Sequence, residues 1–213
     1  MAERWTFGVG ALAQTEAAAA LLRRVTSLVL ALEEHDDEVD RLIADLQRAE
    51  TTLGGRVPAD LAPRVGPGAH GDGRVYLDHA YDIGAFNPCF PEYDIAVDGD
   101  RATGTVTFPI AYEGPPGIVH GGFLGVFFDC AVQHHNCEVG VAGKTTSMAI
   151  RFKRPAPLLR TLTFTIERTA GDDRIRSVAH LYDGDRLVCE ADVDAIAGNR
   201  ANLPAVSPRR SSK

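Results

Sequence analysis

The stretch Gly114–Asp129, GPPGIVHGGFLGVFFD, determines how the rest of the chain is interpreted. Pro115 and Pro116 exclude a helix just before it, because a proline pushes its predecessor out of the α region. After His120 the run is apolar on every side, which predicts a buried helix rather than an amphipathic surface helix. Asp129 interrupts this run. A buried carboxylate is costly unless it is paired or hydrogen-bonded, so its presence indicates a specific role.

Two glycines stand at the predicted start of this helix. Gly121 and Gly122 leave backbone N–H groups uncovered by side chains, and both the free donors and the helix dipole attract negative charge. A developing oxyanion needs such pre-aimed dipoles. The simpler interpretation is that the glycines only allow close packing of the helix on a sheet.

These residues resemble a known family. The sequence HGG at 120–122, with Asp129 nine positions after the histidine, resembles the PaaI-type hotdog-fold acyl-CoA thioesterases. Arg154-Pro155 matches the family's usual strand ending, and the similarity runs from about Tyr93 to Ile196. The resemblance implies hydrolysis of an acyl-CoA or acyl-carrier thioester. We expect no cofactor.

The resemblance also implies roles for single residues. In the family, the backbone N–H after the motif histidine polarises the thioester carbonyl, and the helix acid is nucleophile or general base. These roles fall on Gly121 and Asp129, and a family hydroxyl ten residues before the Arg-Pro proline falls on Thr145. His120 is either a general base or, as is more usual in the family, a residue that orients the turn.

The substrate-binding residues are predicted around the same motif. Many family members have asparagine where this chain has Gly114, and the neighbouring Glu113 is polar but charged. Gly122 and Glu113 are predicted substrate-binding residues. Lys153 and Arg154 are either solvated strand-end charges or the cations that bind the CoA phosphates. Three aromatic residues are candidate walls of an acyl pocket, with the core as the simpler alternative: Phe86, Phe123 and Phe127.

The spacing of the helix residues leads to a prediction about assembly. Gly121 and Asp129 are eight positions apart on one helix, which is roughly 12 Å at the helical rise. A thioester carbonyl and its attacking oxygen must be roughly 3 Å apart. One chain therefore cannot supply both groups to one substrate, whereas two antiparallel helices across a two-fold axis can. If both assignments hold, the protein is a homodimer or a dimer of dimers.

Other chemistry at the same helix is disfavoured. Asp129 and His134 have the Asp-x4-His spacing of hotdog hydratases, but residues five positions apart do not share a helix face. His134, His135 and Cys137 are accompanied by no other spaced ligands, so we expect no metal site. The adjacent histidines are interpreted as solvated caps at the helix end.

The composition limits the class of protein. The chain has 213 residues, enough for one domain with an appendage, and its formal net charge of −7 disfavours nucleic acid as a general partner. Four cysteines without zinc-type spacing indicate a reduced, cytoplasmic protein. No signal peptide is evident, and the apolar stretch Ala17–Leu32, broken by Arg23-Arg24, is too short to span a bilayer.

The N-terminal part has a helical pattern. Ala11–Leu53 contains neither glycine nor proline, and its apolar residues follow a heptad spacing that predicts one long helix or two stacked ones. The acidic cluster at 33–38 is the expected break, where Asp36 or Asp37 would cap a second helix. These helices either pack on their own domain or pair between subunits. We expect a helical segment at 1–53, a linker at 54–73, the hotdog domain at 74–198 and a disordered tail at 199–213.

Alternating apolar residues predict six strands around the buried helix. Two of them precede the helix and are joined by a turn at Asp98-Gly99-Asp100; four follow as a meander with a turn at Asp183-Gly184-Asp185. This pattern favours an α+β hotdog fold, in which an antiparallel sheet wraps around a central helix, with an N-terminal helical extension. The predicted strands are 93–97, 102–108, 145–153, 159–169, 175–182 and 187–196.

Two other functions remain open at this point. The chain could be a catalytically silent acyl-CoA-binding module, because the family asparagine is replaced by Gly114. It could also be a scaffold in which the N-terminal helices mediate assembly and the hotdog unit is only structural.

Overall fold

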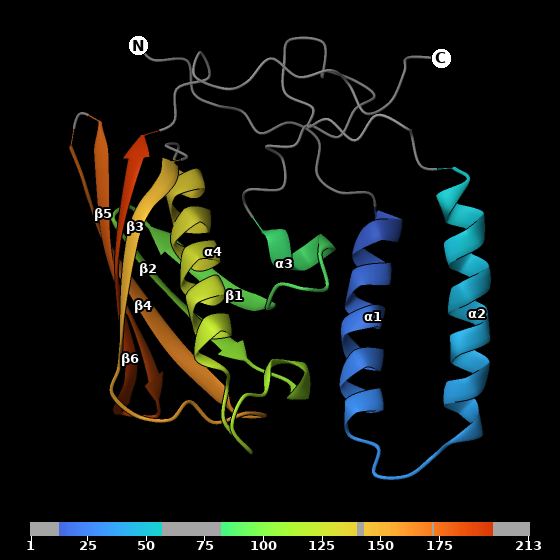
Figure 1. Ribbon diagram of the computed structural model, residues 1–213. Helices are drawn as coiled ribbons and strands as arrows, with labels where there is room; N and C mark the ends of the chain where they lie inside the picture. Colours follow the sequence, from blue (N-terminus) through green and yellow to red (C-terminus); the bar gives the residue numbers. More distant parts are fainter. Residues whose placement is uncertain (1–12, 57–81, 140–142, 172, 198–213) are drawn as a thin grey trace.

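The computed structural model describes residues 13–56, 82–139, 143–171 and 173–197 (Figure 1). Residues 57–73 of the predicted linker and the whole predicted tail at 199–213 lie outside the described residues. In the described part, no helix is both long and apolar enough to cross a membrane.

All six predicted strands are present and form one antiparallel sheet in the order β1-β2-β4-β5-β6-β3. Gly99 and Gly184, at φ of 56° and 59°, make the two predicted turns, where a left-handed backbone favours glycine. The strands are β1 Tyr93–Asp98, β2 Arg101–Thr107, β3 Gly143–Phe152, β4 Thr161–Ala170, β5 Arg174–Asp183 and β6 Arg186–Ala197.

The predicted four-strand meander is wrong in one respect. β4, β5 and β6 do follow one another in the sheet, but β3 pairs with β6 rather than with β4. Since β2 and β5 occupy the two sides of β4, β3 cannot pair with β4, and it lies at the edge of the sheet beside β6. Alternation in the sequence shows where strands run, but it does not show which strands are neighbours. Consequently β3 is an edge strand, beside the central helix (Figure 1).

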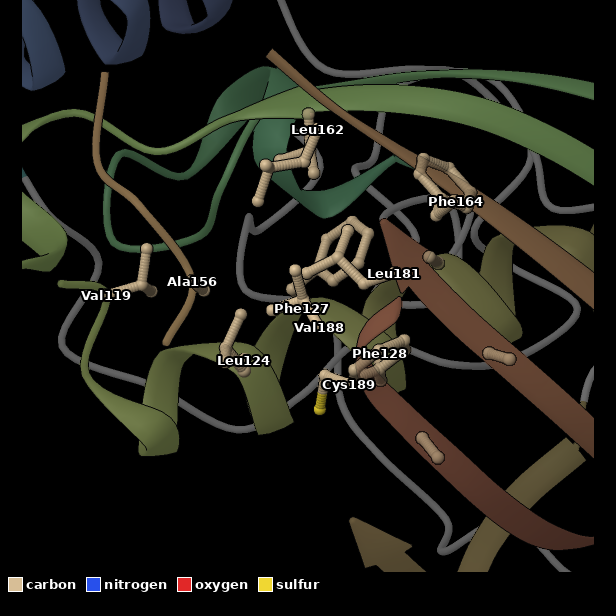
Figure 2. Close-up of a cluster of buried hydrophobic side chains, with 14 of the residues drawn as sticks. Val119, Leu124, Phe127, Phe128, Ala156, Leu162, Phe164, Leu181, Val188 and Cys189 are labelled. Carbon is tan, nitrogen blue, oxygen red and sulfur yellow. The ribbon is translucent and has the colours of Figure 1, made fainter. Parts of the chain in front are cut away.

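The central helix α4, Gly121–Val139, packs on one face of the sheet. Figure 2 shows Phe127 and Phe128 of this helix among side chains of β4, β5 and β6. Phe127 is fully buried and meets the ring of Phe164 edge-on at 5.2 Å between centroids. Its replacement by alanine would cost about 3–5 kcal/mol of stability. Phe127 is therefore a core residue, and its predicted alternative role as a pocket wall is wrong.

The N-terminal segment consists of two helices, α1 Ala13–Leu30 and α2 Asp37–Gly54. The break falls at the acidic cluster, where the side chain of Asp36 accepts a hydrogen bond from the backbone N–H of Glu38 at 2.8 Å. Asp36 is thus the N-cap of α2, one of the two predicted candidates. The two helices run antiparallel (Figure 1).

One residue of α1 connects it to the rest of the molecule. The guanidinium of Arg23 is 5% exposed and donates to the carbonyl oxygens of Gly84, Asn87 and Phe90 at 2.5, 3.2 and 3.3 Å. It also pairs with the carboxylate of Glu92. These groups lie in and after the short helix α3, Ile83–Phe86, against which α1 packs. Helix α1 therefore packs on its own domain, whereas α2 buries no residue.

Candidate functional site

The N-terminus of α4 offers one unused backbone donor. His120 precedes the helix, and its backbone N–H donates to the carbonyl of Tyr112 at 2.9 Å. Its ring Nδ1 accepts the backbone N–H of Gly122 at 3.0 Å. Among the described residues, the N–H of Gly121 has no hydrogen-bond partner. Both bonds of His120 lie within the turn before the helix, and they leave Gly121 as the open donor.

Asp129 lies in the middle of α4 and is bound from the edge strand. The hydroxyl of Thr145 on β3 donates to Oδ1 of Asp129 at 2.6 Å. The side-chain amide of Gln133 donates to the same hydroxyl oxygen at 2.8 Å. Because an amide NH₂ can only donate, the proton of the Thr145 hydroxyl is directed at the carboxylate. The structure thus brings together two predicted residues, Asp129 and Thr145, in a short hydrogen-bonded chain.

Gln133 was not singled out by the sequence analysis. Its position four residues after Asp129 was the available signal, because residues at that spacing share a helix face.

The face of α4 that carries Asp129 continues towards the helix start with two glycines. Gly121, Gly125 and Asp129 follow one another at four-residue intervals and face β3. A Cβ at Gly121 would lie 3.1 Å from Cζ of Phe152, and one at Gly125 would lie 3.3 Å from Cδ1 of Ile150. We call this surface the α4–β3 strip: Gly121, Gly125, Asp129 and Gln133 on α4 with Thr145, Ile150 and Phe152 on β3.

The loop before the helix differs from the family pattern in its geometry. A Cβ at Gly114 would lie 2.8 Å from Cα of His120, so no side chain fits there without a backbone shift. The carboxylate of the neighbouring Glu113 accepts the backbone N–H of Gly117 at 2.7 Å. Glu113 therefore stabilises its own loop, and it is the backbone at Gly114 that lies against the histidine.

The predicted phosphate ligands lie at the end of β3, just after Phe152. Nζ of Lys153 is 3.3 Å from a carboxylate oxygen of Glu190, and this bond lowers the pKa of Glu190. Nη1 of Arg154 donates to the carbonyl of Leu187 at 2.8 Å. Both cations thus have partners on the neighbouring strand β6. A phosphate at this end would compete with these contacts.

The predicted aromatic walls divide between core and site. Phe123 is half-buried and its ring meets that of Tyr112 at 4.8 Å between centroids and that of His120 at 6.1 Å. It therefore lies beside the turn that presents Gly121. Phe86 is half-buried on α3.

The two adjacent histidines are not solvated caps, so that prediction is wrong. His135 is fully buried and its Nε2 donates to the carbonyl of Gly99 at 2.8 Å. The side chain of His134 is 12% exposed and its Nδ1 is 3.3 Å from the hydroxyl of Tyr93. Burial lowers the pKa of both imidazoles. Asp129 contacts β3 while His134 contacts β1, so the two do not form a pair.

The thiol beside the acid is not a competing nucleophile. Cys130 is 8% exposed, and burial raises its pKa to about 12. In the described residues, which include all four cysteines, no cysteine forms a disulfide. In the described residues, the histidines and cysteines of α4 belong to no group that could hold a metal ion.

The comparisons with known proteins now place the fold. No model of a protein family matches the chain, and no curated protein matches it. Among solved structures, the thioesterase superfamily protein RHA08564 superposes with a TM-score of 0.68 at 26% identity, over 90% of this chain and 93% of that one. The chain has the hotdog fold of the thioesterase superfamily. Since residues 82–197 are about half of the chain, this match also includes part of the N-terminal extension.

Two further solved structures match about half of the chain. PaaI of E. coli, from the phenylacetic acid degradation operon, has 22% identity over 50% of this chain and 80% of its own, with a TM-score of 0.47. The Streptococcus mutans protein smu.793, bound to acetyl CoA, has 15% identity over 51% and 90%, with a TM-score of 0.49. The predicted α+β hotdog fold and the predicted resemblance to hotdog-fold thioesterases are confirmed.

Proposed function

We propose that this hotdog protein hydrolyses an acyl-CoA or acyl-carrier thioester at a site shared by two chains. The observation that carries the proposal is the α4–β3 strip. It has an open backbone donor at Gly121 at one end and an oriented carboxylate at Asp129 two helical turns away. The thioesterase superfamily fold supports the same chemistry.

Each end of the strip has one task. The N–H of Gly121, strengthened by the helix dipole, polarises the thioester carbonyl and stabilises the oxyanion that forms on it. Asp129 attacks the carbonyl carbon itself or removes a proton from the attacking water. Thr145 holds the carboxylate in place through its 2.6 Å hydrogen bond. When the tetrahedral intermediate collapses, the C–S bond breaks and the CoA or carrier leaves as a thiolate. If Asp129 is the nucleophile, this leaves a mixed anhydride on Asp129, which water then hydrolyses to the free acid and the carboxylate.

Gly121 and Asp129 of one chain act in two different active sites of the dimer. Eight residues of α-helix separate Gly121 from Asp129 by roughly 12 Å, whereas the reacting atoms must be roughly 3 Å apart. The edge strand β3 exposes Phe152 by 58% and Met148 by 37%, and an edge of this kind favours pairing with another strand. Two β3 strands that pair about a two-fold axis set the two α4 helices antiparallel. Gly121 of one chain then faces Asp129 of its partner.

The remaining predicted residues act in binding. Lys153 and Arg154 lie next to Phe152, at the Gly121 end of the strip, where they reach the phosphates of a bound CoA by exchanging their contacts on β6. Phe123 walls the acyl group beside the turn. Gly122 and Glu113 stabilise the loop around His120. The N–H of Gly122 bonds to the ring nitrogen Nδ1 of His120, and the carboxylate of Glu113 accepts the N–H of Gly117.

One observation favours a second function, a catalytically silent acyl-CoA-binding module. The backbone at Gly114 lies so close to His120 that a water-holding side chain has no room there. A panel of acyl-CoA thioesters separates the two functions. Binding of these compounds without release of free thiol would favour the silent module.

The experiment that tests the shared site uses two inactive variants. Asp129→Asn removes the acid, and Gly121→Pro removes the backbone donor while proline is tolerated at a first helical position. We expect each homodimer to be inactive. In a heterodimer of the two variants, each site takes Gly121 from one chain and Asp129 from the other. One site therefore contains both substitutions, and the other site contains neither. A doubly tagged, purified heterodimer should therefore show roughly half of the wild-type activity per dimer.

Gly121→Ala is the matched control. It adds the same Cβ against Phe152 but keeps the N–H, so it separates loss of the donor from crowding of the strip. Circular dichroism checks that each variant folds. A folded heterodimer without recovered activity would refute the shared arrangement.

A further inference from the structure

The helical extension carries an apolar surface that the proposed hydrolysis does not use. Helices α1 and α2, with the residues between them, contain nine of the thirteen large hydrophobic side chains that are exposed among the described residues. They include Leu21 at 53%, Leu28 at 67%, Leu46 at 47% and Leu53 at 57% exposure. Apolar exposure concentrated in this way marks an interaction surface.

On α1 this surface is opposite to the face that packs on the hotdog unit. Ala19 and Arg23 are the buried residues of α1. At 100° per residue, Leu21, Val25 and Leu28 lie on the other side of the helix. The contact with α3 is therefore satisfied without them, and they are available to another helix.

On α2 the same spacing forms an apolar stripe, in which Val39 and Leu42 are half-buried and Leu46, Ala49 and Leu53 are exposed. Val39, Leu42, Leu46, Ala49 and Leu53 follow the heptad spacing, and none of them is buried. Most of the stability of a helix in a protein comes from packing of its apolar face, and α2 buries no residue, so covering this stripe would stabilise it. The contact between α2 and its own α1 is at most slight, so the exposed part of this stripe is available to another helix.

The two stripes fit one another. In an antiparallel pairing, apolar residues of α1 and α2 meet in successive layers, as in a coiled coil. The layers are Ala18 with Ala49, Leu21 with Leu46, Val25 with Leu42, and Leu28 with Val39. The apolar stripe of an α1 helix can therefore bury the apolar stripe of an α2 helix, and the reverse.

The flanking charges decide between the available helices. The positions beside the α2 stripe carry Glu38, Asp45 and Glu50, so two α2 helices side by side would place acid against acid. The positions beside the α1 stripe carry Leu22 and Arg24 and no acid. The pairing that suits both stripes is therefore α1 with α2.

We propose that α1 and α2 of one chain pack against α2 and α1 of a second copy and form a four-helix bundle. The exchange is reciprocal, so it closes about a two-fold axis and leaves no stripe exposed. The helical extension lies on the side of the molecule away from β3 (Figure 1). The bundle consequently joins chains other than those that pair through β3, and it builds a dimer of dimers.

The first test compares the native masses of two full-length variants by analytical ultracentrifugation. Leu46→Lys places a charge in the α2 stripe, and Ala44→Lys places the same charge on the opposite, exposed face of α2. We expect Leu46→Lys to halve the number of chains in the assembly and Ala44→Lys to leave it unchanged. Thioester hydrolysis per chain should stay the same in both, so this test is independent of the proposed activity. Equal masses for both variants would overturn the bundle.

The second test identifies which helices meet. Leu21→Cys and Leu46→Cys are made in separate, differently tagged chains, each in a Cys89→Ser background because Cys89 is the exposed native thiol. The chains are co-expressed and oxidised. A disulfide-linked product that carries both tags is expected, since one chain alone cannot form it. Absence of this product, with a disulfide formed only when both cysteines are in one chain, would show that each hairpin closes on itself.

Discussion

The hydrogen bond from Thr145 to Asp129 allows the site to be tested without removing the acid. Thr145→Val keeps the shape and the strand preference of the side chain but removes the hydroxyl that donates at 2.6 Å. A hydrogen bond to a charged group contributes about 1.5–3 kcal/mol. Because Thr145 is exposed and water can replace part of this bond, the lower end applies. At about 1.4 kcal/mol per factor of ten, we expect roughly a tenfold loss of kcat with an unchanged KM.

The assay is release of free CoA thiol from an acyl-CoA that the wild-type protein hydrolyses. Asp129→Asn should lose at least roughly a hundredfold in turnover, as expected for loss of a positioned acid or base. The double variant should be no slower than Asp129→Asn, because Thr145 acts only through that carboxylate. Two results would refute this reasoning. One is full activity of Thr145→Val; the other is a further tenfold loss in the double variant, which would give Thr145 a role of its own.

Two more predictions follow from the described contacts. Lys153→Ala combined with Arg154→Ala should raise KM more than it lowers kcat, and the difference should shrink with added salt; a pure turnover defect would place these cations elsewhere. Burial lowers the pKa of His135, so the unfolded state binds more protons than the folded state as the pH falls through about 6.5. Stability should therefore decrease towards acidic pH, and the melting temperature of His135→Gln should depend less on pH than that of the wild type. Equal pH dependence in both proteins would contradict this.

Much of the fold could be predicted from local patterns. The alternating residues predicted every strand within two residues, because side chains on a sheet covered by one helix must alternate between core and solvent. The run after His120 predicted α4 because it is apolar on every side, as expected for a buried helix. The position of β3 could not be predicted this way. It depends on the pairing of β4 with β2, a contact between residues far apart in the chain.

The family resemblance is the source of the roles assigned to Gly121, Asp129 and Thr145, and these roles stay predictions. The structure shows an open N–H at Gly121 and a hydrogen bond from Thr145 to Asp129. Gln133 and Phe152 were missed because each acquires its place through the packing of α4 on β3. His135 was misjudged for a related reason. Its burial depends on the hairpin at Gly99, which no pattern around residue 135 reveals.

Under the proposed function, the active site and the pairing surface are the same surface. Phe152 contacts the helix start at Gly121, and Thr145, on the same edge strand, binds the acid. A change that shifts β3 along α4 therefore displaces the donor, the acid and the partner strand together. The helical extension has no such coupling, because Arg23 fixes it to α3 on the side away from β3. This separation explains how a second assembly surface can coexist with a site that tolerates little movement, since helix pairing places no strain on the strip.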